Sequence, residues 1–159
     1  MKQTHQQTPD ISQITDYLYI SAWPKGEYAD DIQALKVRLI LSMHWWRPSK
    51  RLGQPPLRLC WLPTIDTRFT PMPMSTFQRG VEAALPVIEA GWSVLTHCRS
   101  GVHRSVAMAC CVLIGQGYLA DEAMQLVKKQ REVADPDKWY IQRRIRKFEQ
   151  GWNSVQMTD

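Results

Sequence analysis

The sequence lacks several features that would assign it to common functional classes. Its four cysteines contain no CxxC pair, which argues against a zinc ribbon or a thioredoxin-type motif. No apolar stretch reaches the length that crosses a membrane, and the opening MKQTHQQTPD lacks the apolar segment of a signal peptide. Internal repeats and low-complexity tracts are also absent. We therefore expect a cytoplasmic protein, and in that compartment cysteines stay reduced.

The composition is that of one globular domain. The chain has 159 residues, of which 44% are hydrophobic, and this is enough for a substantial core. A formal charge of +5 is compatible with anionic partners such as phosphoproteins or phosphorylated small molecules. We expect a disordered tail over residues 1–10, a single domain over residues 11–152 and a C-terminal tail over residues 153–159.

Apolar runs and turn residues predict strands and helices in alternation. Short strands are expected at residues 17–21, 37–43, 57–62 and 92–97. Helices are expected at residues 28–36, from a Ser75 cap to Gly91, at 105–116, at 121–131 and from Asp135 onward. The predicted fold class is α/β, with a short central, mostly parallel sheet of four to five strands and helices on both faces.

The stretch HCRSGVHRS, residues 97–105, joins the last expected strand to the most apolar expected helix. The backbone N–H groups of residues 99–104 can converge into an anion-binding nest, and Gly101 allows the positive φ that such a ring requires. The positive end of the following helix points to the same place. These dipoles are expected to lower the pKa of the Cys98 thiol from its usual value of roughly 8.5. Arg104 offers a planar fork for two phosphoryl oxygens, and Ser105 can donate a hydrogen bond to the Cys98 sulfur.

This stretch resembles the signature HC-x-x-G-x-x-R-S of the cysteine-dependent protein tyrosine phosphatases, and specifically their compact dual-specificity branch. The fixed positions are matched by His97, Cys98, Gly101, Arg104 and Ser105. The likeness extends from about residue 11 to residue 148 and includes the segments YLYIS, DIQALKVRLILSM, LPTID and VLTHC. It implies a phosphatase domain whose phosphate-binding loop lies between a central strand and a buried helix.

The resemblance also implies roles for individual residues. Cys98 attacks phosphorus and forms a cysteinyl-phosphate, and Ser105 helps the sulfur to leave in the second step. The general acid of the family lies about thirty residues upstream on a loop, and Asp66, which stands 32 residues before Cys98, matches it. His97 is expected to orient the loop, or to be a buried histidine without a chemical role. The phosphate-binding residues are expected to be Arg99, Ser100, Gly101, Val102, His103 and Arg104.

Four other interpretations of the same stretch are weaker. Rhodanese-type sulfurtransferases have a similar loop, but with four residues between cysteine and arginine, whereas five separate Cys98 from Arg104 here. An inactive phosphate-binding module would normally lack the nucleophile or the acid, and both are present. Metal binding by His97, Cys98 and His103 has no zinc-like spacing, so we expect neither a metal nor an organic cofactor. A strand–helix junction without chemistry does not need these residue types at these offsets.

The expected substrates are proteins carrying phosphotyrosine, and in addition phosphoserine or phosphothreonine. The alternative is an inositol phosphate or a phosphoinositide, because Arg99 and His103 add cations to the loop, and some inositol-polyphosphate phosphatases of this superfamily have histidine before the arginine. We expect no nucleic-acid partner and no membrane span, and the sequence leaves the oligomeric state open.

Three other features allow two interpretations each. Trp45 and Trp46 either line the mouth of the site or pack against the proline-rich loop that follows, and packing is the preferred interpretation. Cys60 is expected to be a buried cysteine, with a protective disulfide to Cys98 as the alternative. The basic residues of the last helices are expected to form a solvated face rather than a binding surface, and they comprise Lys128, Lys129, Arg131, Lys138, Arg143, Arg144, Arg146 and Lys147.

Overall fold

A computed structural model describes residues 9–157 and contains one five-stranded sheet. The strands are β1 (Ile11–Thr15), β2 (Leu18–Ser21), β3 (Val37–Ser42), β4 (Arg58–Trp61) and β5 (Ser93–His97). Their order across the sheet is β1-β2-β5-β3-β4. Only the β1–β2 pair is antiparallel, and the other pairs are parallel. The predicted α/β class with a mostly parallel sheet is confirmed.

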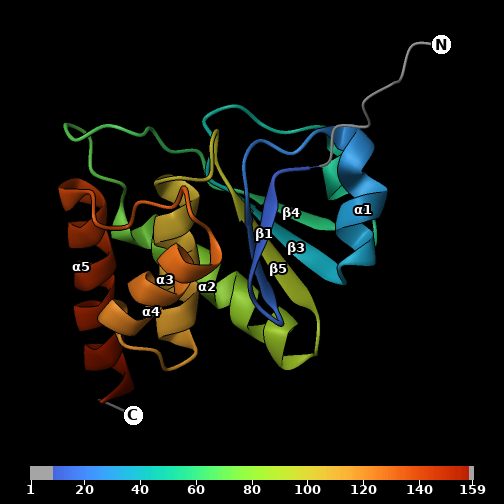
Figure 1. Cartoon of the computed structure of the whole chain (residues 1–159). Coiled ribbons are helices and arrows are strands. Elements are labelled where there is room, and N and C mark those ends of the chain that lie inside the picture. The colour runs from blue at the N-terminus through green and yellow to red at the C-terminus, as the bar shows by residue number, and fades with distance from the viewer. Residues whose placement is uncertain (1–8, 158–159) are drawn as a thin grey trace.

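Helices cover both faces of this sheet. They are η1 (Gly26–Tyr28), α1 (Ala29–Ala34), η2 (Lys50–Gly53), α2 (Met74–Glu89), α3 (Arg104–Gly115), α4 (Ala120–Gln130) and α5 (Trp139–Gln156). Helix α1 lies on one face, and α2 to α5 form a layer on the other (Figure 1). None of the helices in residues 9–157 combines the length and hydrophobicity of a membrane-crossing segment.

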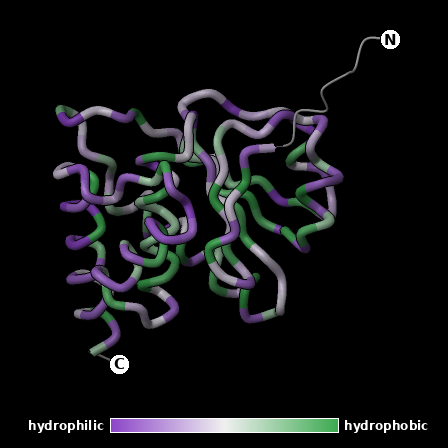
Figure 2. The backbone as a smooth tube through the Cα atoms, viewed as in Figure 1, coloured by the Kyte–Doolittle hydropathy of each residue, from purple (hydrophilic) through white to green (hydrophobic). Residues whose placement is uncertain are grey.

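Helix α3 is the centre of the larger core. Its sequence RSVAMACCVLIG is buried along its length apart from Gly115, because α2, α4, α5 and the sheet surround it. Figure 2 shows hydrophobic residues along the strands and α3, whereas the outermost helix α5 alternates hydrophobic and hydrophilic positions. The α5 stripe of Ile141, Ile145 and Phe148 faces inward as predicted. The connection from β5 to α3 therefore starts at the carboxyl edge of the parallel strands and ends in a fixed helix.

Several element boundaries differ from the prediction. Strand β1 was not predicted, because its polar residues at positions 12, 13 and 15 give no continuous apolar run. Helix α2 begins at Met74 with Pro73 at the N-cap position, so Ser75 is not the cap. Asp135 does not start the last helix, which begins at Trp139 with Lys138 at the N-cap position, and the Asp135 backbone N–H donates to the Val102 carbonyl at 3.0 Å. That bond ties the segment before α5 to the loop after β5.

The structure describes part of each of the two predicted tails. Of the tail expected at residues 1–10, residues 1–8 lie outside the described part, and Asp10 is ordered by contacts with Arg131. Helix α5 continues through Gln156, beyond the expected domain end at Trp152. Trp152 stacks on Phe148 with ring centroids 5.7 Å apart and packs against the core, whereas residues 153–157 are exposed. Residues 158 and 159 lie outside the described part.

Candidate active site

Cys98 follows β5 directly and is 3% exposed. Its Sγ lies 3.2 Å from the Ser105 Oγ in the first turn of α3. Burial raises the pKa of the Cys98 thiol, but hydrogen bonds from the Ser105 side chain and from the backbone of Ser105 and Gly101, together with the Arg104 charge, outweigh it and lower that pKa. The lowered pKa increases the fraction of thiolate, which is the reactive form of cysteine.

The Arg104 guanidinium is held beneath this loop. Its Nη1 donates to the Met43 carbonyl at 3.2 Å and to the Thr64 carbonyl at 2.8 Å. Its Nε is buried and has no hydrogen-bond partner among the described residues. Because an unpaired buried donor is costly, this N–H is suited to an anion bound in the loop.

Gly101 is the one position of the loop that requires glycine. Its φ is +67°, in the left-handed region that side chains with a Cβ rarely adopt. A Cβ here would lie 2.6 Å from the Arg131 Nη2 and 2.8 Å from the Ser21 carbonyl oxygen. The loop is therefore packed closely from both sides.

Arg131 fastens the loop from α4. Its side chain donates from Nε to the Gly101 carbonyl at 2.8 Å and from Nη2 to the Ser100 carbonyl at 3.1 Å. Both Nη atoms also pair with the Asp10 carboxylate at 2.9 Å. Arg131 is only 2% exposed, so its predicted place on a solvated basic face is wrong. It follows Val127 by four positions and therefore continues the buried face of α4.

His97 is buried at the base of the loop. Burial lowers the pKa of its imidazole to about 4, so the ring is neutral near pH 7. Its Nδ1 lies 3.3 Å from the Cys98 carbonyl oxygen, and Trp23 packs edge-on against the ring with centroids 5.8 Å apart. It pairs in register with Ser21 and Ser42 on the adjacent strands. These contacts agree with an orienting role beside the nucleophile.

The structure brings Asp66 to the far end of the same loop. One carboxylate oxygen, Oδ2, lies 2.9 Å from the His103 Nδ1, and the other, Oδ1, accepts a hydrogen bond from the Tyr140 hydroxyl at 2.8 Å. Burial, followed by the hydrogen bond to Asp66, raises the pKa of Tyr140 to about 12. Tyr140 therefore remains a donor at any physiological pH.

The remaining loop positions differ in what they offer to a substrate. His103 lies between two carboxylates, since its Nε2 is 3.5 Å from the Asp135 Oδ2. Arg99 is exposed and forms no ion pair within residues 9–157. Val102 supplies a carbonyl to Asp135, and Ser100 is exposed with its carbonyl on Arg131. Within residues 9–157, no three histidine, cysteine or acidic residues gather as a metal site would require.

Aromatic side chains stand on the segment after β3. Trp45 and Trp46 are 54% and 70% exposed, so the preferred prediction that they pack against the proline-rich loop is wrong. His44 joins this segment to its surroundings, because its carbonyl accepts from the Trp61 indole at 3.0 Å and its ring packs against Trp23 at 4.6 Å. Met43, directly before it, holds Arg104.

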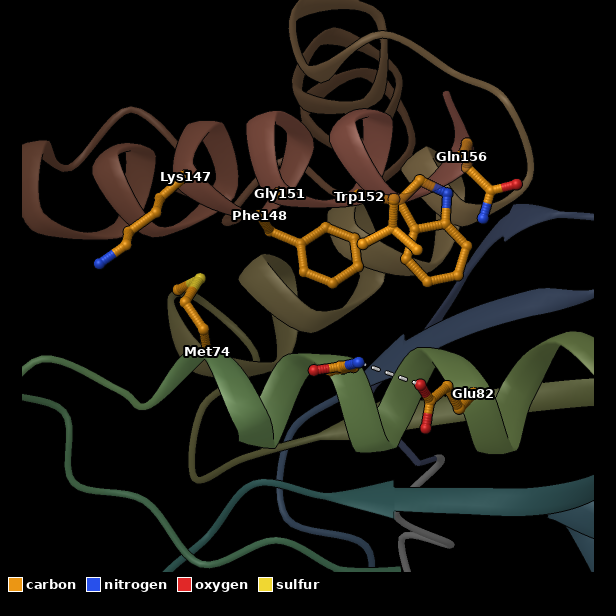
Figure 3. Close-up of a pocket in the computed structure, with 9 residues that line it drawn as sticks. Met74, Glu82, Lys147, Phe148, Gly151, Trp152 and Gln156 are labelled. Carbon is orange, nitrogen blue, oxygen red and sulfur yellow. Dashed lines mark hydrogen bonds between the residues drawn. The ribbon is translucent and has the colours of Figure 1, made fainter. Parts of the chain in front are cut away.

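A separate apolar groove of about 420 Å³ lies between α2 and α5. Figure 3 shows Met74, Phe148 and Trp152 reaching into the space between these helices. No residue of the loop after β5 lines the groove, so it is not part of the candidate active site.

Sequence reasoning missed Arg131, Asp10 and Tyr140 as contributors to the site. A signal existed for Arg131, whose spacing from Val127 continues the buried face of α4. Tyr140 precedes the first inward residue of α5, but nothing in its spacing indicates a contact with Asp66. Asp10 stands before a strand that was not predicted.

No established protein-family model matches the sequence. Mouse dual specificity protein phosphatase 22 is 28% identical over 144 residues, which cover 87% of this chain and 73% of that protein. The crystal structure of human DUSP28 superposes with a TM-score of 0.81 at 19% identity, over 92% of this chain and 97% of that one. PTPMT1 in complex with PI(5)P gives a TM-score of 0.80 at 18% identity, over 92% of this chain and 99% of that one. The two solved structures support the fold, and the mouse relative extends the likeness to sequence.

Proposed function

We propose that the chain is a member of the compact dual-specificity branch of the cysteine-dependent protein tyrosine phosphatases, as its similarity to mouse dual specificity protein phosphatase 22 supports, and that it hydrolyses phosphate monoesters on phosphorylated proteins. The substrates are phosphotyrosine and, in addition, phosphoserine and phosphothreonine. We assign the activity to a single domain over residues 11–152 and place the protein in the cytoplasm, where Cys98 stays reduced.

The proposed reaction has two steps. The Cys98 thiolate attacks phosphorus, so an S–P bond forms while the bond from phosphorus to the leaving oxygen breaks and Asp66 protonates that oxygen. Water then attacks phosphorus, Asp66 takes its proton, and the S–P bond breaks to return the thiolate. The Ser105 hydroxyl, 3.2 Å from the sulfur, stabilises the departing thiolate. Arg104 and the loop amides hold the phosphoryl oxygens throughout.

A single observation carries this proposal. A cysteine with a lowered pKa lies next to a buried guanidinium whose Nε has no partner within the described chain. A thiolate and an unused donor at one loop suit an incoming phosphoryl group, because the first can attack phosphorus while the second holds a phosphoryl oxygen.

The first test measures hydrolysis of 4-nitrophenyl phosphate by the wild type, Cys98→Ser and Asp66→Asn, with thiosulfate sulfur transfer in parallel. We expect turnover by the wild type that vanadate inhibits and Cys98→Ser abolishes. Asp66→Asn should slow the hydrolysis of phenyl phosphate, which has a poor leaving group, far more than the hydrolysis of 4-nitrophenyl phosphate. Thiosulfate activity without phosphatase activity would instead support a sulfurtransferase, and phosphate binding without turnover an inactive module.

Phosphoinositides or inositol phosphates are the second candidate substrates. The similarity to PTPMT1, which was solved with PI(5)P, and the exposed Arg99 favour them. Against them, Asp66 and Asp135 already neutralise the charge that His103 can carry. Only one of the two additional loop cations is therefore available to a polyanion.

A substrate panel separates the two candidates. Phosphotyrosine and phosphothreonine peptides are compared with inositol polyphosphates and micellar PI(5)P, using the wild type and Arg99→Gln. The protein-phosphatase proposal predicts the highest kcat/KM for a phosphopeptide. A preference for inositol lipids or phosphates that Arg99→Gln reduces about tenfold or more, as expected for loss of a charge-assisted contact, would transfer the assignment to the second candidate.

A further inference from the structure

His103 is the loop residue whose surroundings the proposed reaction does not yet explain. The ring lies with Nδ1 2.9 Å from the Asp66 Oδ2 and Nε2 3.5 Å from the Asp135 Oδ2. The other titratable or charged groups beside it are Tyr140 on α5, with ring centroids 6.2 Å apart, and Arg104, the next residue of the chain. Each ring nitrogen of His103 therefore faces a carboxylate oxygen, which can accept a hydrogen bond from it.

Asp66 faces a difficulty as a general acid. An aspartate carboxyl in water has a pKa of about 3.9 and is almost fully ionised at neutral pH. The acid must nevertheless supply a proton to the leaving oxygen. The hydrogen bond between Asp66 and His103 allows one proton to lie on either the carboxylate or the imidazole, so the pair can keep a proton where the carboxyl alone would have lost it.

We propose that His103 holds the proton that Asp66 delivers, and that Asp135 keeps it there. This inference rests on the proposed phosphatase function. In the first step Asp66 takes the proton from Nδ1 and passes it to the leaving oxygen, which leaves Asp66 ionised and His103 neutral. In the second step Asp66 removes a proton from water, and the proton returns to Nδ1. The pair thus loses and regains one proton in each cycle, and no other reactant is needed.

Asp135 and Tyr140 hold the Asp66–His103 pair in position. Asp135 is anchored by its own backbone, because its N–H donates to the Val102 carbonyl at 3.0 Å, so its carboxylate stays opposite Nε2. Tyr140 occupies the second oxygen of Asp66 and holds the carboxyl group in register with His103. His103 is a positioning and proton-holding residue, since it acts on the substrate only through Asp66.

The test is the pH dependence of kcat/KM for phenyl phosphate and 4-nitrophenyl phosphate. His103→Asn keeps an amide where Nδ1 lies, so it preserves a hydrogen bond to Asp66 but cannot titrate. We expect the alkaline limb for phenyl phosphate to move to lower pH by about one unit, which lowers the rate at pH 7 about tenfold. The leaving group of 4-nitrophenyl phosphate needs less protonation, so the alkaline limb measured with this substrate should move much less.

Two further variants complete the experiment. Asp135→Asn removes the carboxylate at Nε2 from a partly exposed position and should move the phenyl phosphate limb in the same direction, so the test does not depend on folding of His103→Asn. Asp137→Asn, whose carboxylate pairs with Lys128 instead, is the matched control and should leave the limb in place. If the pH profiles of both His103→Asn and Asp135→Asn superimpose on the profile of the wild type, the inference is overturned. Absence of turnover by the wild type would contradict the proposed function instead.

Discussion

The four cysteines of this chain show how strongly the surroundings of a thiol determine its pKa. Burial raises the pKa of Cys60, Cys110 and Cys111. Cys98 is as well buried as the two on α3, yet its pKa is lowered, because Ser105 and the loop amides donate to its sulfur. The reactivity at this residue therefore comes from the donors around it and not from exposure.

At the residue scale, Ser105→Ala should raise the pKa of Cys98 and slow the release of the sulfur from phosphate. A hydrogen bond to a charged group contributes about 1.5–3 kcal/mol, so we expect kcat to fall about 10- to 100-fold. The midpoint of the pH dependence of Cys98 alkylation by iodoacetamide, followed by mass spectrometry, should move to higher pH.

Ser93→Ala is the control for this prediction. Ser93 is a buried serine on β5 whose hydroxyl donates to the Asp16 carbonyl, at the opposite end of the strand from Cys98. This variant should leave the alkylation midpoint where it is in the wild type. An unchanged midpoint in Ser105→Ala as well would show that the Ser105 hydroxyl does not influence the thiolate.

At the scale of elements, the loop after β5 is shaped by segments far away in the sequence. Arg131 at the end of α4 binds two of its carbonyls, and Asp10 next to β1 fixes Arg131. The segment before α5 adds the bond from Asp135 to Val102. Three segments outside the strand–loop–helix unit therefore hold the shape of this loop in place.

Arg131→Met should disrupt this geometry while keeping much of the side-chain volume. The Ser100 and Gly101 carbonyls lose their donor, which costs about 1–3 kcal/mol, whereas the Asp10 carboxylate is 61% exposed and can be solvated by water. We expect a loss of stability of that order in urea unfolding, and a fall in kcat/KM for 4-nitrophenyl phosphate measured at a temperature where the variant remains folded.

Arg146→Met provides the comparison, because Arg146 pairs with Asp121 on the surface. Exposed ion pairs contribute about 0–1 kcal/mol, so this variant should retain both stability and turnover. Equal effects of the two substitutions would contradict the special role of Arg131.

The sequence predicted most of these elements and the centre of the site, but not its supports. The offsets within HCRSGVHRS predicted that Cys98, Arg104 and Ser105 lie together at one loop, because these offsets follow from local loop geometry. Arg131 was assigned to the solvent because a charged residue is rarely buried, although its spacing from Val127 pointed inward. The start of α5 was misplaced because Asp135–Pro136 has the residue types of a helix start, whereas α5 begins three residues later at Trp139 and the Asp135 N–H bonds to Val102 instead.

At the scale of the whole molecule, His97 makes stability depend on pH. Burial lowers the pKa of His97 to about 4 in the folded state, against about 6.5 in an unfolded chain. Between these values the unfolded state binds more protons, so stability falls as the pH decreases. We expect this residue to remove about 2 kcal/mol from the free energy of unfolding between pH 7 and pH 5.

Urea unfolding of the wild type and His97→Asn at pH 7 and pH 5 measures this contribution. The variant starts from a lower stability, so the relevant quantity is the change between the two pH values. That change should be smaller in the variant by about 2 kcal/mol. The same change in both proteins would mean that His97 is accessible to protons in the folded state.

The pairing of Asp10 with Arg131 joins positions 121 residues apart. During synthesis Asp10 emerges from the ribosome early, whereas Arg131 emerges only after Cys98 and most of the core have been synthesised. A nascent or clipped chain can therefore contain the reactive sulfur without the clamp that shapes its surroundings. Under the proposed function, turnover of a phosphate ester consequently reports that Asp10 and Arg131 have met, and it can serve as an assay of this long-range contact.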